Sequence, residues 1–296
     1  MVDKEVNLEE LIQKIEKNEV LPTKTFDIIF NKAKVILNKR ENIAILKTPI
    51  NICGCINAHF DELKDIFKIC GDASNIQYLF LGDYVGKGFN SLSVVLLLMV
   101  LLVKYPSNII LLRGNHDSRI MSSCFGLYDE CIKKYTEPDK GKYIFQKINE
   151  LFDLFQLAAI IDNKIFCVHG GLSPKIKKIE EINQIDRKLE IPREGIMTDL
   201  IWSDPSEEIM EYSPSSKGAG QFYGEKAVND FFKENNNINI IIRSHTLVME
   251  GYQYQFNNKL LTIFSAPLYS GRIENIGAVL KLDEKYNYNF IKINAH

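Results

Sequence analysis

The sequence predicts an α/β fold in which two packed mixed β-sheets are flanked by helices. In the first half, three apolar segments end in glycine and a polar residue, and each is followed by a helical pattern. This βαβαβ order is typical of parallel strands. The second half is instead rich in short strands, which does not fit a simple doubly wound sheet. With no internal repeat, low-complexity tract or linker, we expect one domain over residues 1–296.

Composition is that of an ordinary globular protein. Of the 296 residues, 46% are hydrophobic and 25% are charged, with a formal net charge of -2. This balance gives no reason to expect nucleic acid or an anionic membrane as a partner. The longest apolar run, residues 94–103, is too short to span a bilayer and predicts a buried helix. Because the first residues lack a signal pattern, we expect a cytoplasmic protein, or one also found in the nucleus.

The first half of the chain should place three strand tips together. Two amphipathic helices are expected within residues 7–38, at 7–17 with Asn7 as cap and at 25–38, both packing on the core. Strands are predicted at 49–53, 76–81 and 108–112, with helices at 60–69 and 91–105. The carboxyl ends of parallel strands lie at one edge of a sheet, so the three tips should converge. These tips are residues 54–59, 82–88 and 114–119.

The second half begins with helix and continues with strands. Helical pattern runs from residue 119 to about residue 154. Strands are predicted at 157–161, 164–168, 238–242 and 260–264, and a closing hairpin at 277–282 and 286–293. Residues 204–221, with their prolines and glycines, are expected to form a loop.

Histidines follow directly after three of the apolar strands. They are His116, His169 and His245, three of only five in the chain. A single histidine at a strand end is more often a hydrogen-bonded turn or core residue than a ligand. Three of them, with Asp83 and Asn115 in matching positions, favour a metal site. Mixed nitrogen and oxygen ligands suit Mn, Fe or Zn better than Mg or Ca.

Several longer blocks resemble the signature sequences of the metal-dependent serine/threonine phosphoprotein phosphatases. They are residues 79–85, 111–116, 167–174, 201–205 and 264–267. The likeness runs from about residue 8 to 282, and 217–220 and 248–252 look most like the type 2A branch. The resemblance implies a calcineurin-like metallophosphoesterase fold. It also implies hydrolysis of phosphoserine and phosphothreonine in proteins with the help of two metal ions.

The resemblance assigns roles by position. The ligands of one metal would be Asp83, Asn115, His169 and His245, the proton donor His116, and the groups at the substrate phosphate Lys87, Lys217 and Tyr269. Both lysines stand where the family has arginine. They keep the charge but lose the planar two-point grip on phosphate, so phosphate binding should weaken yet survive.

Three family positions are altered in this chain. Cys55 and Asn57 replace the aspartate and histidine that hold the other metal, and Gly86 replaces the aspartate that orients the proton donor. Because two dications repel unless anionic ligands offset their charge, we expect one divalent ion and leave a second open. Cys55 as a thiolate could hold a soft metal such as zinc if its pKa were lowered, and His59 could also substitute as a ligand.

Two functions remain open on the sequence alone. One is a protein serine/threonine phosphatase whose catalysis is weak or lost, and the other is a pseudophosphatase that binds phosphoproteins or subunits. Two-metal chemistry needs both ions, so the substitutions favour impaired catalysis. A decaying gene copy is a third reading, against which the intact packing pattern argues. The branch also suggests scaffold and regulatory subunits, although residues 289–296 do not resemble the tail that helps assemble them.

Overall fold

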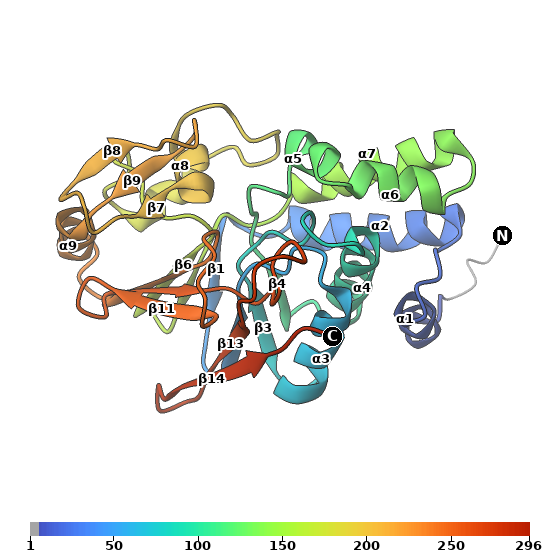
Figure 1. The fold of residues 1–296 in the computed structure, drawn as a ribbon, viewed down its shortest axis with the longest axis horizontal. Coiled ribbons are helices and arrows are strands. Elements are labelled where there is room, and N and C mark those ends of the chain that lie inside the picture. The colour runs from blue at the N-terminus through green and yellow to red at the C-terminus, as the bar shows by residue number, and fades with distance from the viewer. Residues whose placement is uncertain (1–5) are drawn as a thin grey trace.

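The structure, a computed structural model, describes residues 6–296 as two packed β-sheets with helices on their outer faces (Figure 1). The expectation of a cytoplasmic protein came from the first residues of the chain, and residues 1–5 lie outside this range. The six-stranded sheet runs in the order β1 (Ile43–Leu46), β5 (Ala158–Ile161), β6 (Ile165–Val168), β10 (Ile240–Arg243), β12 (Leu260–Ile263) and β11 (Tyr252–Gln255). Parallel and antiparallel pairs occur in both sheets, so the predicted fold class is confirmed.

The five-stranded sheet contains the βαβαβ unit. Its order is β14 (Tyr288–Ile293), β13 (Gly277–Leu282), β2 (Ile50–Cys53), β3 (Gln77–Phe80) and β4 (Ile109–Leu111). Strands β2, β3 and β4 are parallel, with Cys53 beside Phe80 and Phe80 beside Leu111 at their carboxyl ends. The closing hairpin of β13 and β14 is also present as predicted.

Aliphatic side chains fill the space between the sheets. Ile52, Leu79 and Ile110 of one sheet pack against Ile242 and others of the facing sheet, and all are buried. Several strands are buried on both faces because helices cover the outer surfaces. Such strands read as continuous apolar runs rather than alternating ones, which is why the sequence revealed them.

In the described chain, seven helices precede β5 on the outer side of the five-stranded sheet, some contacting its strands and others packing on those helices. They are α1 (Leu8–Glu16), α2 (Thr23–Asn38), α3 (Phe60–Cys70), α4 (Ser91–Lys104), α5 (Arg119–Cys124), α6 (Leu127–Lys134) and α7 (Pro138–Phe152). The Asn7 side chain caps α1 by accepting from the N–H groups of Glu9 and Glu10. Helix α4 is buried along nearly its whole length, as its apolar run predicted. Among the described residues, no helix is long and apolar enough to cross a membrane.

The second half contains structure that the sequence did not predict. The loop expected at 204–221 is wrong, because β7 (Asp204–Pro205), β8 (Tyr212–Pro214) and β9 (Gln221–Tyr223) form a small third sheet there. Strands of two or three residues carry no alternation that could reveal them. The prediction also omitted β1, β11, the 3₁₀ helix Ile179–Gln184, α8 (Ile196–Trp202) and α9 (Glu225–Glu234). The last three cover the outer face of the six-stranded sheet.

Candidate metal centre at the strand tips

The strand tips of the first half converge as predicted. The N–H groups of Ile56 and Asn57 donate to the carbonyl oxygen of Asp83 at 3.0 and 2.8 Å. Gly114 lies so close that a Cβ on it would come 2.3 Å from the Asp83 backbone nitrogen. Glycine is therefore required at this tip, because any side chain would push the strands apart.

Asp117 ties two of these tips together. Its carboxylate accepts from the N–H groups of Asp83 and Gly114, both at 2.8 Å, and of Tyr84 at 3.0 Å. Burial raises the pKa of Asp117 to about 6, although these amides act in the opposite direction. Arg113, fully buried, donates from Nε to the Asp117 carbonyl oxygen at 3.0 Å. The signature-like block at 111–116 is thus held in place by a dense hydrogen-bond network.

The six-stranded sheet contributes its own tips to the same edge. His169 follows β6, and His245 follows β10 two residues after Arg243. A parallel β-bridge between Cys55 and Phe264 joins the tip of β2 to that of β12. Both sheets therefore deliver polar side chains to one place.

His169 is held in the tautomer that a metal ligand needs. Its Nδ1 lies 2.8 Å from the carbonyl oxygen of Leu81, which can only accept, so Nδ1 carries the proton. The lone pair of Nε2 then faces the Asn115 side-chain end at 3.2 Å and Asp83 Oδ1 at 3.5 Å. Burial lowers the pKa of His169 to about 3, so the ring is neutral. A hydrogen bond from the second ring nitrogen is the usual way a metal-binding histidine is oriented.

The Asn115 amide cannot satisfy all of its neighbours at once. With its oxygen inward it accepts from His245 Nδ1 at 2.9 Å, but then faces the His169 lone pair and the Asp83 oxygens. With its nitrogen inward it donates to His169, Asp83 and His245, and His245 Nε2 then has to carry a proton toward the Lys217 ammonium at 3.0 Å. A cation among Asp83, Asn115, His169 and His245 would remove this conflict, so the residues present fit one metal ion.

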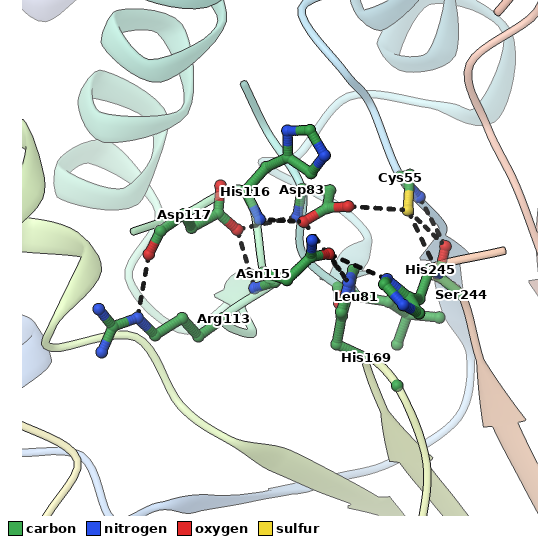
Figure 2. A network of polar contacts seen from close by, with 12 residues as sticks. Cys55, Leu81, Asp83, Arg113, Asn115, His116, Asp117, His169, Ser244 and His245 are labelled. Atoms are coloured by element: carbon green, nitrogen blue, oxygen red, sulfur yellow. Dashed lines mark hydrogen bonds and ion pairs between the residues drawn. The ribbon is translucent and has the colours of Figure 1, made fainter. Parts of the chain in front are cut away.

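Cys55, which stands where the family has an aspartate, lies directly beside Asp83 and His169. Its Sγ is 3.7 Å from Asp83 Oδ2, 3.1 Å from Ser244 Oγ and 3.3 Å from the N–H of His245 (Figure 2). Among the residues described, Cys55, Asp83 and His169 form the group of ligand side chains whose donor atoms all lie within 4.8 Å of one another. Burial, and then the Asp83 charge, raise the pKa of the Cys55 thiol well above its usual range.

Asn57 and His59, the other two candidate ligands near the tip of β2, are not part of this donor group. Asn57 is 1% exposed, and within the described chain neither polar atom of its side chain has a hydrogen-bond partner. His59 points its Nδ1 at the carbonyl oxygens of Ile56 and Asn57, at 3.1 and 3.0 Å, directly before α3. His59 is not part of the clustered donor group found in residues 6–296.

His116 is close to Asp83 through its backbone but not through its ring. Its N–H donates to Asp83 Oδ1 at 2.8 Å, while the ring lies beside Phe125 with centroids 4.9 Å apart. Figure 2 shows the ring pointing away from His169 and His245. In the described part of the chain the buried Nδ1 has no hydrogen-bond partner. Burial, and then the nearby Lys87 charge, lower the pKa of His116 to about 4.

Gly86 adjoins the unpartnered nitrogen of His116. A Cβ on Gly86 would come 2.5 Å from His116 Nδ1, and the glycine φ is +84°. The imidazole thus fills the space in which a side chain at position 86 would begin. The sequence predicted that no carboxylate at position 86 orients His116. In the structure the His116 ring also occupies the space that such a carboxylate would need.

The predicted phosphate-binding groups lie on two sides of the centre. Lys217 Nζ contacts Asp204 Oδ2 at 2.5 Å and His245 Nε2 at 3.0 Å. Lys87 lies instead on the His116 side, with Nζ 3.9 Å from the centroid of the Phe125 ring. The Tyr269 ring packs on Phe264 at 5.3 Å, in the cluster that contains Cys55. Burial, followed by the charges of Cys55 and Asp83, raises the pKa of Tyr269.

Sequence reasoning gave no role to two residues that position the site. Asp204 binds Lys217 and accepts from Arg243 Nη2 at 2.8 Å, so it fixes the lysine beside His245. Ser244 accepts from the Cys55 N–H at 2.8 Å and faces its sulfur. Asp204 could have been noticed because it lies within one of the signature-like blocks, whereas a lone serine carries no such signal.

Comparison with known proteins identifies the class. A family model described as calcineurin-like phosphoesterase matches residues 48–249, which is more than half of the chain. The chain belongs to this family, whose members are metal-dependent phosphoesterases. The predicted fold and the phosphoesterase class are therefore confirmed.

Among solved structures, one similar protein is a serine/threonine phosphatase from Saccharomyces cerevisiae, itself described as similar to human phosphatase PP5. It is 30% identical, with 97% of this chain and 96% of that chain covered and a TM-score of 0.89. A cold-active protein-tyrosine phosphatase of a psychrophilic Shewanella sp. is 14% identical, with 87% and 84% covered and a TM-score of 0.58. This second likeness shows the fold alone. Membership of the type 2A branch stays a prediction.

Proposed function

We propose that the chain is a serine/threonine phosphatase-like protein of type 2A character that binds phosphoserine or phosphothreonine in proteins at a one-ion centre. Hydrolysis at this centre is weak or lost. One observation carries the proposal. At the tip of β2 this chain has the thiol of Cys55 and the amide of Asn57, where the resemblance implies an aspartate and a histidine that bind metal. Asp83 is then the one carboxylate in the clustered donor group, too little negative charge to hold two dications close together.

One divalent ion fits the residues that are present. Asp83, Asn115, His169 and His245 supply the mixed nitrogen and oxygen donors that suit Mn, Fe or Zn. When bound, the ion would draw electron density from a phosphoryl oxygen and offset its negative charge. The neutral tautomer of His169, fixed by the Leu81 carbonyl, leaves a lone pair free for such binding.

Phosphate recognition is supported by the two lysines and by Tyr269. Lys217 is held beside His245 by Asp204, and Lys87 lies over the Phe125 ring, which also contacts the His116 ring. A phosphomonoester between them would meet positive charge from both directions. Lysine ammonium groups act as point charges rather than planar forks, so binding is weaker than with arginine but remains.

Weak catalysis is supported by the state of His116. This residue would protonate the leaving serine or threonine oxygen, but no carboxylate at position 86 orients it, and its Nδ1 is buried without a partner in the described chain. A proton donor whose ring is not fixed by a hydrogen bond spends less time in a productive position. The leaving oxygen would then depart with little assistance.

The limiting form of this proposal is a pseudophosphatase, a module that holds phosphoproteins or regulatory and scaffold subunits without turnover. The retained ligands and lysines favour it, because they preserve binding while the altered positions all bear on hydrolysis. A cytoplasmic or nuclear location also belongs to the proposal. It is supported by six free cysteines, five of them buried, as expected of a reducing compartment.

The test is hydrolysis of a phosphothreonine peptide by the full chain with added Mn²⁺. We expect little turnover by the natural sequence and a rise of at least about tenfold in the double variant Cys55→Asp with Asn57→His, which restores a second set of ligands. Cys124→Asp, at an exposed cysteine, is the matched control. Rapid turnover by the natural sequence would contradict the proposal.

A further inference from the structure

We propose that Cys55 is itself a metal ligand, so that the one ion is held through sulfur, oxygen and nitrogen by Cys55, Asp83 and His169, in place of direct bonds to Asn115 and His245. Such a site would prefer a zinc-like ion to manganese. This inference rests on the one-ion centre of the proposed function. It goes beyond it by naming a ligand that the family does not use and the kind of ion that the ligand selects.

The distances agree with ligands of a single tetrahedral ion. With metal–sulfur bonds of about 2.3 Å and metal–nitrogen or metal–oxygen bonds of about 2.1 Å, two ligand atoms lie about 3.4–3.6 Å apart. Cys55 Sγ is 3.7 Å from Asp83 Oδ2, and His169 Nε2 is 3.5 Å from Asp83 Oδ1. These two distances involve different oxygens of the Asp83 carboxylate, and one donor atom from each of the three residues lies within 4.8 Å of the others, so a small movement of the side chains would bring all three onto one ion.

Groups around the sulfur are arranged to support a bound thiolate. The N–H of His245 faces Sγ at 3.3 Å, and the Ser244 hydroxyl lies 3.1 Å from Sγ and 2.7 Å from the Ile263 carbonyl oxygen, so its one proton is divided between these two acceptors. Hydrogen bonds toward a ligand sulfur orient it and stabilise its negative charge. The Cys55 backbone is fixed as well, because its N–H donates to Ser244 Oγ and the residue bridges to Phe264.

A second observation at the same tip points to a ligand. Asn57 is 1% exposed, and in residues 6–296 both polar atoms of its amide lack a hydrogen-bond partner. Buried polar groups without partners are uncommon and call for an unseen partner, such as an ion or water. The altered tip therefore carries two buried polar side chains, one of which already faces Asp83.

The chemistry of sulfur decides which ion would bind. Thiolate, imidazole and carboxylate together suit zinc and cobalt, whereas manganese prefers oxygen ligands. When the metal–sulfur bond forms, the thiol proton is released to solvent. Three protein ligands leave a fourth position open, as in zinc enzymes that admit water or substrate, and here a phosphate oxygen could take it.

Cobalt is the probe, because a thiolate ligand gives Co²⁺ a charge-transfer absorption band in the near ultraviolet. We expect the metal-free full chain to take up one Co²⁺ and to show this band. Cys55→Ala should lose the band. Cys55→Asp should keep one Co²⁺ without the band, which separates loss of sulfur from loss of the fold. Cys53→Ala, at another buried cysteine of the same strand end, should keep it.

Competition between zinc and manganese gives a second readout. Cys55→Asp should narrow the preference for Zn²⁺ over Mn²⁺ by about tenfold or more, because it replaces sulfur with oxygen. One Co²⁺ per chain without the charge-transfer band would overturn the Cys55 ligand and leave the proposed function standing. Two Co²⁺ per chain would overturn the one-ion centre of the proposed function. Persistence of the band in Cys55→Ala would assign it to another thiol and overturn this inference.

Discussion

At the scale of single residues, the His116 ring, the predicted proton donor, packs directly against Gly86. A carboxylate that oriented His116 could not simply be added back, since its Cβ would meet the ring at 2.5 Å. The ring has no partner on Nδ1 in the described chain and rests against Phe125, which also lies under Lys87. The substitutions at 86 and 87 thus share one packing arrangement with His116.

Gly86→Asp alone should therefore lower stability rather than restore catalysis. The new side chain needs a backbone φ of +84°, which costs roughly 1–2 kcal/mol for a non-glycine residue, and it must also displace the imidazole. Urea unfolding against the natural sequence measures the loss. Gly271→Asp is the control, because its φ is +65° and nothing lies within 4 Å of its Cβ. Equal losses in both variants would show that crowding at His116 contributes nothing.

Lys217→Arg should strengthen phosphate binding. The lysine already lies between Asp204 and His245, and a planar guanidinium there can grip two phosphate oxygens at once. We expect inorganic phosphate to bind about three- to tenfold more tightly, measured by calorimetry on the metal-loaded chain. Lys226→Arg, at an exposed lysine on α9, should leave the affinity unchanged. If Lys217→Arg left the affinity for inorganic phosphate unchanged, Lys217 would not contact the bound phosphate.

At the scale of elements, the predictable parts are those whose pattern is local. The buried helix α4 follows from its apolar run, and α1 from its amphipathic face with the Asn7 cap. The helical stretch after residue 119 is in fact three helices. A break falls at Gly126, whose φ is +98°, and another before Pro138. The third sheet escaped prediction because its strands are held by tertiary pairing rather than by their own pattern.

The turn between β5 and β6 offers a prediction with a defined pH dependence. Asp162 Oδ2 accepts from the N–H and hydroxyl of Thr48, at 3.1 and 2.8 Å, which links this turn to the β1–β2 connection. Burial acts to raise the pKa of Asp162, but the hydrogen bonds from Thr48, together with Tyr286 and the Lys164 charge, outweigh it, so the pKa is lowered. A lowered pKa means that the unfolded chain binds the proton more readily than the folded one. The stabilisation is therefore present above the unfolded pKa and is lost as pH falls through the folded pKa.

Asp162→Asn should accordingly cost about 0.5–1.5 kcal/mol of unfolding free energy at pH 7, the range for a net hydrogen bond. The difference from the natural sequence should shrink below about pH 4, the unfolded pKa of aspartate. Urea unfolding at both pH values measures it, with Asp129→Asn on the surface of α6 as the control. A difference that stays constant with pH would show that charge on Asp162 plays no part.

At the scale of the whole molecule, the site exists because two sheets end at one edge. The tips of β2, β3 and β4 bring Cys55, Asp83 and Asn115, while β6 and β10 bring His169 and His245. Strand ends with polar residues made the convergence within one sheet predictable. Histidines at strand ends also predicted that the second sheet brings His169 and His245 to this edge, but the contact of Cys55 with Ser244 and His245 depends on packing that no local pattern encodes. The sequence allowed Cys55 as a ligand only on the condition of a lowered pKa, whereas the structure places its sulfur 3.7 Å from Asp83 Oδ2.

Ligand binding to this edge should also stabilise the whole fold, because it joins segments far apart in the chain. A free ion concentration of about 100 times the dissociation constant would add about 2.7 kcal/mol to the free energy of unfolding. Removing the ion should therefore lower the thermal midpoint, and Zn²⁺ should restore it. An unchanged midpoint after chelation would mean that no ion binds the folded chain.

The most direct test of the one-ion centre is the number of metal ions per chain, measured by native mass spectrometry of the full protein loaded with excess Zn²⁺ or Mn²⁺. We predict one ion in the natural sequence, and two in the double variant Cys55→Asp with Asn57→His, because the added carboxylate and imidazole supply ligands for a second dication. Two ions bound specifically by the natural sequence would contradict the account.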